Sequence, residues 1–347
     1  DPMSDGFMCR SGNDSINGNN DTMLYIAIRR PDGYVGKPAD AGTDVLSIGT
    51  RSGSSSNALA CVNTLTDFSL IKNYGAGEYW AANARLMGNL TLKANTNNAH
   101  LTGALPTSGG VWDRMLGHLV AGSNGATNSP TGNMVDYGWK RHAGFDVVAN
   151  LKEFNSHNLG KTPEMVWIKR RDNTADWFVW HKGLNGGTND GLGRNLRLNT
   201  NASENSTPSL CPIGDELPTA THFKTASDSD IRNAGSIAFL FASVDGISKV
   251  GSYTGTGSSL TITTGFQPRF VIIKKASGSG ANRNWYVLDT TRGWASGNDK
   301  ILLLSDDDAE TNDTDMGAPT STGFTLTGET HSGWNASSRK YIYYAHA

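Results

Sequence analysis

The sequence has few cysteines and none of the spacings that form a disulfide framework or a zinc site. Its three cysteines, Cys9, Cys61 and Cys211, lie far apart, and no C-x-x-C pair occurs. Disulfide scaffolds and structural zinc sites use even-numbered or closely spaced cysteines. We therefore expect free thiols that are buried as small apolar side chains.

Long apolar runs and blocks of like charge are also missing. The longest apolar runs, such as 23–28 and 237–242, are much shorter than the roughly 18 residues that cross a bilayer. The formal net charge is −2, and basic and acidic residues are scattered along the chain. No basic face is therefore expected to neutralise a row of phosphates. We predict neither a membrane nor a nucleic acid as a partner.

The short signatures of common catalytic and nucleotide-binding sites do not occur. The sequence lacks G-x-S-x-G, H-E-x-x-H, a Walker loop and a complete G-x-G-x-x-G motif. The spacing of its carboxylates along the chain also favours no pair for glycoside cleavage. We predict a protein that is not an enzyme and that binds no cofactor.

Residues that form turns and short strands are abundant. The chain has 41 glycines and many Asn, Ser and Thr residues, which are typical of turns. Between them lie short runs rich in Val, Ile, Trp, Tyr and Phe, and helical periodicity is nearly absent. The alternating run 177–182 predicts a half-buried strand, and the apolar run 237–242 predicts a central strand covered on both faces. The fold class that we predict is all-β, with tandem small β-sandwich domains.

An internal repeat supports the prediction of tandem domains. Residues 164–171 align with 269–275, because an apolar run precedes a basic pair in both. Later motifs follow in the same order and spacing: 177–180 with 285–288, 196–204 with 302–310, and 237–242 with 341–345. A diverged third copy is visible in 68–72, 79–80, 90–99 and 134–139.

The repeat divides the chain into four parts. Residues 1–32 match only the closing part of a unit, so we expect an incomplete first repeat there. Residues 33–142 form a diverged sandwich repeat, and residues 143–246 and 247–347 form two closer copies. A period of about 100 residues is too long for a solenoid, so we expect self-contained domains in a string.

Several of these motifs resemble a known family. Residues 140–148, 157–169 and 181–187 resemble proteins encoded by marine tailed phages, notably phages that infect cyanobacteria. Residues 265–274, 284–289 and 341–345 resemble a repeated domain of unknown function in the tail-fibre and other virion structural proteins of such phages.

The resemblance implies a non-enzymatic structural component of the virion. We expect a tail fibre or tail appendage, with other virion proteins as partners and possible contact with a host-surface glycan. Fibres are commonly closed homo-oligomers, and we expect a homotrimer. The alternatives are a decoration protein of the capsid or neck, and a carbohydrate-binding or carbohydrate-cleaving module.

Tryptophans outside the strand patterns are the candidate contact residues. Trp112, Trp294 and Trp334 lie in loops that contain Gly or Asp, where an aromatic face could stack on a sugar ring. Anchoring of a loop, or a contact between subunits, is the alternative. The tryptophans inside strand patterns are expected to pack in the core: Trp167, Trp177, Trp180 and Trp285.

Two charged features complete the predictions. The acidic loop of 306–310, Asp313 and Asp315 offers the oxygens that calcium prefers, but it lacks the glycine and final glutamate of an EF-hand loop. We predict a solvated turn and no metal there. His181 and Lys182 follow a Trp-rich strand and are expected at the surface.

Overall fold

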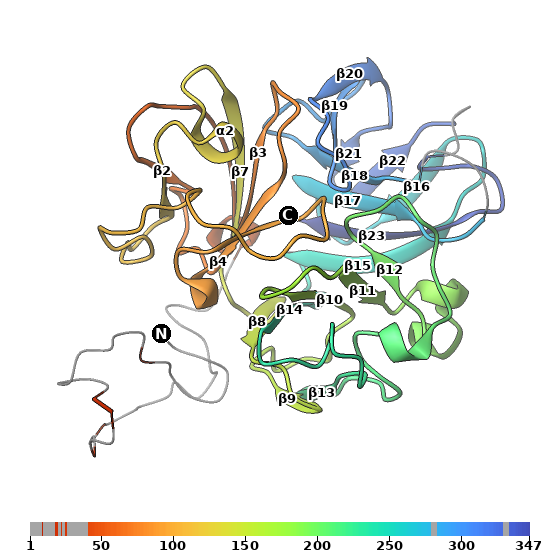
Figure 1. Ribbon diagram of the computed structural model, residues 1–347. Helices are drawn as coiled ribbons and strands as arrows, with labels where there is room; N and C mark the ends of the chain where they lie inside the picture. Colours follow the sequence, from red (N-terminus) through yellow and green to blue (C-terminus); the bar gives the residue numbers. More distant parts are fainter. Residues whose placement is uncertain are drawn as a thin grey trace.

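The computed structural model (Figure 1) describes residues 41–278, 283–328 and 333–347, together with five further positions before residue 41. The protein is 37% strand and 7% helix, which confirms the all-β fold class. The helical pieces are η1 (Gly42–Asp44), η2 (Arg85–Met87), α2 (Gly125–Asn128), η3 (Leu184–Gly191) and η4 (Pro208–Leu210). The incomplete repeat expected at 1–32 lies outside the continuously described residues.

Three main sheets are built from three successive segments, which we call the first (33–142), second (143–246) and third (247–347) segments. The sheet of the first segment has the strand order β1-β7-β3-β4-β5. Its strands are β1 (Leu46–Ser52), β3 (Phe68–Asn73), β4 (Ala81–Ala84), β5 (Thr91–Lys93) and β7 (Asn133–Trp139).

The sheet of the second segment repeats this order as β8-β14-β10-β11-β12. Its strands are β8 (Phe145–Ala149), β10 (Met165–Arg170), β11 (Trp177–His181), β12 (Leu196–Arg197) and β14 (Ser236–Phe241).

The sheet of the third segment has the order β15-β23-β17-β18-β19-β20, which is the same order with one further strand. Its strands are β15 (Ser248–Thr254), β17 (Phe270–Lys275), β18 (Trp285–Asp289), β19 (Asp299–Leu303), β20 (Thr311–Thr314) and β23 (Lys340–His346). In all three sheets the last main strand of a segment pairs with the first, so each segment closes on itself.

A small antiparallel sheet accompanies each main sheet. In the first segment it pairs β2 (Ala58–Ala60) with β6 (His118–Val120), and in the second β9 (Phe154–Ser156) with β13 (His222–Lys224). In the third it contains β16 (Leu260–Thr263), β21 (Pro319–Thr320) and β22 (Gly323–Leu326). A buried apolar cluster that belongs to one segment lies on this side of each main sheet.

The opposite faces of the three main sheets meet in one common core. Figure 1 shows the three segments arranged around the middle of the molecule. The largest buried cluster takes residues from all three sheets, and its aromatic rings touch across the segments. The ring of Phe68 lies 4.3 Å from that of Phe239, Trp139 lies 5.6 Å from Phe270, and Phe241 lies 5.0 Å from Tyr344.

The shared core corrects the expectation of self-contained domains in a string. Each segment has sandwich character, but one face of its main sheet is covered only by the other two segments. Strand β11 illustrates the arrangement: Trp177 and Val179 belong to the shared core, whereas Phe178 and Trp180 belong to the second segment's own cluster. The strand predicted to be half-buried is therefore buried on both faces, because alternation here separates two cores and not core from solvent.

Hydrogen bonds join the segments in a cycle. One indole of each segment donates to a backbone carbonyl of a neighbouring segment, each at 2.9 Å: Trp80 to Leu303, Trp177 to Lys93, and Trp285 to Arg197. Backbone amides repeat the pattern in the opposite direction: His100 to Arg171, Glu204 to Ala276, and Glu310 to Tyr74. Each segment is thus bonded to both others.

A lysine near the end of the equivalent strands β3, β10 and β17 also forms a hydrogen bond to a neighbouring segment. Lys72 donates to the carbonyl of Asp307, Lys169 to that of Asn97, and Lys274 to that of Thr200. All three lysines are buried. Burial lowers the pKa of Lys72 and of Lys169 to about 8, and it lowers the pKa of Lys274 well below its ordinary value.

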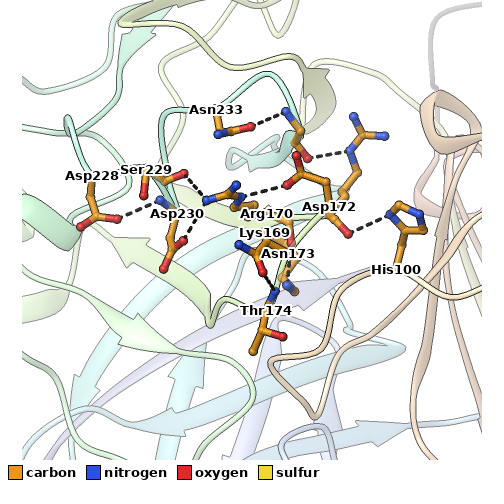
Figure 2. Close-up of polar contacts among 12 residues, drawn as sticks. His100, Lys169, Arg170, Asp172, Asn173, Thr174, Asp228, Ser229, Asp230 and Asn233 are labelled. Atoms are coloured by element: carbon orange, nitrogen blue, oxygen red, sulfur yellow. Dashed lines mark hydrogen bonds and ion pairs between the residues drawn. The ribbon is translucent and has the colours of Figure 1, made fainter.

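Figure 2 shows the junction of the first and second segments at the end of β10. The His100 ring nitrogen Nδ1 lies 2.8 Å from the carbonyl oxygen of Arg171. Next to it, the guanidinium of Arg170 pairs with Asp172 at 2.9 Å and with Asp230 at 3.4 Å. Two successive basic residues of the repeat motif therefore have different partners. Lys169 contacts the first segment, and Arg170 contacts a loop of its own segment.

The predicted central strand, two of the three cysteines and the core tryptophans are buried as the sequence predicts. The run 237–242 forms the interior strand β14, which is buried throughout, as predicted. Cys61 and Cys211 are buried free thiols, as expected, whereas Cys9 is exposed. The four tryptophans predicted to pack in the core are at most 1% exposed: Trp167, Trp177, Trp180 and Trp285.

Candidate functional site

All three candidate contact tryptophans are buried, and the indole nitrogens of two of them hold loop carbonyls. The indole nitrogen of Trp112 donates to the carbonyl of Gly88 at 2.6 Å, and its ring stacks on His118 with the centroids 4.4 Å apart. The indole nitrogen of Trp294 donates to the carbonyl of Gly317 at 2.8 Å. These side chains are 7% and 2% exposed, so neither ring offers a free face to a sugar in this structure.

Trp334 is also buried, at 4% exposed, and it is one of the residues that line a surface pocket in the third segment. The pocket has a volume of about 220 Å³ and is lined by Tyr286, Ile301, Leu303, Asp308, Ala309, Thr311, Thr314 and Trp334. The rings of Trp334 and Tyr286 meet edge to face, with their centroids 5.9 Å apart. The lining residues carry two aromatic rings, one carboxylate and three hydroxyl groups, so the pocket has the apolar walls and few polar groups that are typical of ligand sites.

The acidic loop passes one side of this pocket. The carboxylate oxygens of Asp306, Asp307 and Asp308 lie within 4.8 Å of one another, and Asp307 and Asp308 are exposed. Further along, Glu310 pairs with Arg292 at 2.8 Å. Exposed acidic residues commonly gather in this way without an ion, so a solvated turn remains our expectation for residues 306–308.

A second pocket lies on the second segment and is charged. It has a volume of about 350 Å³, and its lining includes Glu153, Asp215, Lys224 and Arg232. Lys224 pairs with Asp215 at 2.9 Å and with Glu153 at 3.8 Å, and Arg232 pairs with Glu153 at 3.4 Å. The hydrogen bond from Lys224 holds the pKa of the Asp215 carboxyl below its ordinary value. A general acid in a glycosidase needs a raised pKa, so Asp215 does not suit that role.

His181 is not at the surface, contrary to the prediction. Its ring is fully buried, Nδ1 accepts a hydrogen bond from the amide of Gly183 at 2.8 Å, and Nε2 lies 3.4 Å from the carbonyl of Tyr343 in the third segment. Burial lowers its pKa to about 3. The prediction was wrong because β11 is covered by two cores, which the local pattern does not reveal. Lys182 follows the prediction more closely and pairs with Glu164.

A buried ionic network was missed by the sequence reading. Arg292 lies 2.6 Å from the carboxylate of Asp289, which accepts a 2.6 Å hydrogen bond from the hydroxyl of Tyr137 in the first segment. With Glu310 as its other partner, Arg292 satisfies charges that would be costly to bury alone. No motif marks these residues, because Tyr137 lies in a different segment and Glu310 is 18 residues from Arg292 in the sequence.

Comparison with known proteins gives one family. A family described as "Domain of unknown function (DUF7483)" matches residues 37–347. The chain belongs to this family. The match to DUF7483 runs through all three main sheets, so the family is defined over the whole three-segment body and not over one segment.

Neither a curated protein nor a solved structure matches the chain. In the described part of the chain, no helix combines the length and the apolar character needed to cross a membrane.

Proposed function

We propose that this DUF7483 chain is a non-enzymatic structural component of a tailed-phage virion, in a tail fibre or tail appendage. The observation that carries the proposal is the resemblance of residues 134–347 to virion proteins of marine tailed phages, which covers several motifs in a fixed order. On this proposal, other virion proteins are its partners and a host-surface glycan is a possible contact.

The architecture supports a mechanical role. Three segments share one core, and hydrogen bonds join each segment to both neighbours. The strongly buried cations Lys72, Lys169 and Lys274 are used to hold backbone carbonyls across these junctions. Such a closed body resists local opening, which suits a spacer or a knob that carries load between other proteins.

The two pockets give different evidence about the alternative of a carbohydrate-binding or carbohydrate-cleaving module. In the charged pocket, the cations already neutralise the carboxylates, so we do not propose a carbohydrate-cleaving activity. In the aromatic pocket, the buried Trp334 is one of the lining residues, and this pocket is the observation that keeps ligand binding as a second candidate function of the same structural protein.

The proposal is tested on purified particles of a phage whose genome encodes this chain. Quantitative mass spectrometry should find the chain in a fixed number of copies per particle, and cryo-electron microscopy should place three-fold sets of copies on the tail. Copies spread over the capsid lattice would replace the tail role with a decoration role. Absence of the chain from washed particles would overturn the proposal.

We also propose a homotrimer as its assembly state. Light scattering on the purified full chain should give three times the mass of one copy. A single copy over the micromolar concentration range would contradict the trimer without bearing on the location in the virion.

A further inference from the structure

Exposed apolar side chains gather in one region of the first segment. Seven large apolar side chains are exposed in the part of the chain that the structure describes, and four of them lie in residues 59–62 and 115–116. Single exposed apolar residues are ordinary on a protein surface, whereas a group of them marks an interaction site. The four side chains, which are 43%, 47%, 90% and 51% exposed, are Leu59, Val62, Met115 and Leu116.

The small sheet of the first segment presents two leucines to solvent. Leu59 in β2 lies opposite Leu119 in β6, and Leu119 is partly exposed. Their neighbours Ala60 and Val120 are buried in the first segment's own cluster. Since successive side chains of a strand point to opposite faces, Leu59 and Leu119 share the outer face of this sheet. Figure 1 shows β2 on the outer side of the first segment, away from the other two segments.

A turn and a loop beside this sheet bring the other apolar residues to it. The turn that contains Val62 closes with a hydrogen bond from the amide of Thr64 to the carbonyl of Cys61. The carbonyl of Thr64 accepts a 2.8 Å hydrogen bond from the amide of Gly117, the residue after Leu116. The turn and the loop are therefore adjacent. We call the resulting surface the apolar patch, and its members are Leu59, Val62, Met115, Leu116 and Leu119.

The corresponding faces of the other two segments are polar or shielded. In the second segment the exposed ring of Phe154 lies 5.6 Å from the ammonium of Lys224 and 6.1 Å from the ring of His222. In the third segment the exposed residues of β16 are Thr261 and Thr263. The fold therefore does not require apolar side chains on this face, and the patch is specific to the first segment.

Two opposite charges lie next to the patch. Asp113 and Arg114 immediately precede Met115, and both are exposed. Neither side chain makes a hydrogen bond or an ion pair with another of the described residues. In a closed ring or a two-fold contact, Arg114 of one copy can meet Asp113 of the next, so the surface is complementary in charge to itself.

We propose that the apolar patch is a contact surface for a second copy of this chain, around the axis of the homotrimer. The proposal rests on that assembly state and does not depend on the location of the chain in a virion. The apolar side chains form the centre of the contact, and Asp113 and Arg114 form its charged rim. A stable interface buries about 800 Å² on each partner, which is more than five side chains supply, so the contact extends over the polar residues around the patch.

Sedimentation velocity on the full chain, over a range of concentrations, measures the midpoint concentration of association. We expect Met115→Asp and Leu59→Thr each to raise this midpoint at least about tenfold, because each removes apolar area from the contact. Leu217→Thr is the matched control, since Leu217 is 39% exposed in the second segment and lies outside the patch. It should change the midpoint less than about twofold. All three side chains are exposed, and circular dichroism verifies that each variant folds.

A charge exchange tests whether the partner is a second copy. Asp113→Arg alone should raise the midpoint at least about fivefold at low salt, because two arginines then face each other across the contact. Combining it with Arg114→Asp should return the midpoint to within about twofold of the parent value. This restoration requires that both copies carry the exchanged charges.

Association that survives both Met115→Asp and Leu59→Thr would overturn the proposal and leave the homotrimer standing. An equal effect of Leu217→Thr, or no restoration by the double charge exchange, would also overturn it. A parent chain that stays a single copy would overturn both the patch contact and the homotrimer. None of these results would bear on whether the chain is a virion component, which the particle analysis decides.

Discussion

At the scale of single residues, the polar atoms of buried aromatic side chains distinguish the junctions from the rest of the core. Trp285 and Trp167 are both 1% exposed and both belong to the shared core. The indole nitrogen of Trp285 donates to the carbonyl of Arg197, whereas that of Trp167 has no partner among the described residues. Substitution of each tryptophan therefore distinguishes the contribution of packing to stability from the contribution of the hydrogen bond between segments.

We expect Trp285→Phe to lower the free energy of unfolding more than Trp167→Phe. Both changes remove a similar volume, but Trp285→Phe also leaves a buried carbonyl without its donor, which costs about 1–3 kcal/mol. Urea unfolding followed by circular dichroism measures both. Equal losses would show that the indole bonds between segments contribute nothing to stability.

Buried histidines make the stability depend on pH. Burial is the main cause that lowers the pKa of five imidazoles below the ordinary value of 6.5: to about 3 for His118, His142, His181 and His346, and to about 4 for His157. The folded chain keeps these rings neutral, so the unfolded chain binds more protons below pH 6.5.

The stability that these rings contribute is complete above pH 6.5 and is lost as the pH falls toward 4 and 3. We therefore expect a lower free energy of unfolding at pH 5 than at pH 7, with a slope of about 1.4 kcal/mol per pH unit for each histidine. Three buried carboxyls with a raised pKa, Asp136, Asp146 and Asp299, act in the opposite direction but are fewer. Urea titrations at both pH values in 0.3 M salt measure the difference, and equal or greater stability at pH 5 would contradict it.

At the scale of elements, most strands could be predicted from the sequence, because short runs of β-branched and aromatic residues between turn residues favour strands over helices. The alignment of 164–171 with 269–275 found β10 and β17, the equivalent strands of two sheets. The burial of both faces of β11 could not be predicted, since a neighbouring segment covers one of them. The same limitation explains why the prediction of a surface position for His181 was wrong.

At a few turns between strands, the backbone conformation and the close neighbouring atoms require glycine. Gly317, in the turn between β20 and β21, has a φ of +113°, and a Cβ atom there would lie 2.1 Å from the carbonyl oxygen of Thr325. Gly49, within β1, would place a Cβ atom in open space. The two positions thus form a matched pair.

We expect Gly317→Ala to lower the free energy of unfolding by about 2 kcal/mol or more, because it combines backbone strain with a clash against the main chain. Gly49→Ala should leave the stability unchanged or raise it by up to about 1 kcal/mol. Thermal melts of both variants against the parent chain measure the shifts. A loss at Gly49 as large as that at Gly317 would contradict the turn geometry.

At the scale of the whole molecule, the three segments are interdependent. The sequence repeat identified the segments, but their common core follows from long-range packing that no local pattern encodes. The second segment alone would expose one face of its main sheet to water, with the large side chains of Trp167, Trp177, Phe239 and Phe241. Exposed apolar patches of this kind promote association or prevent folding.

We therefore expect residues 143–246 expressed alone to be unfolded or aggregated. Circular dichroism, binding of a hydrophobic dye and size-exclusion chromatography report each state, and the full chain is the control. A soluble monomer with native-like β structure would show that the second segment is an independent domain.

The central claim is that the three segments form one closed body that unfolds as a unit. Differential scanning calorimetry of the full chain tests it most directly, because a single cooperative transition has equal calorimetric and van't Hoff enthalpies. We predict one transition with a ratio of these enthalpies near one. Two or three separable transitions, or a calorimetric enthalpy that is a multiple of the van't Hoff value, would contradict the claim and restore the description of domains in a string.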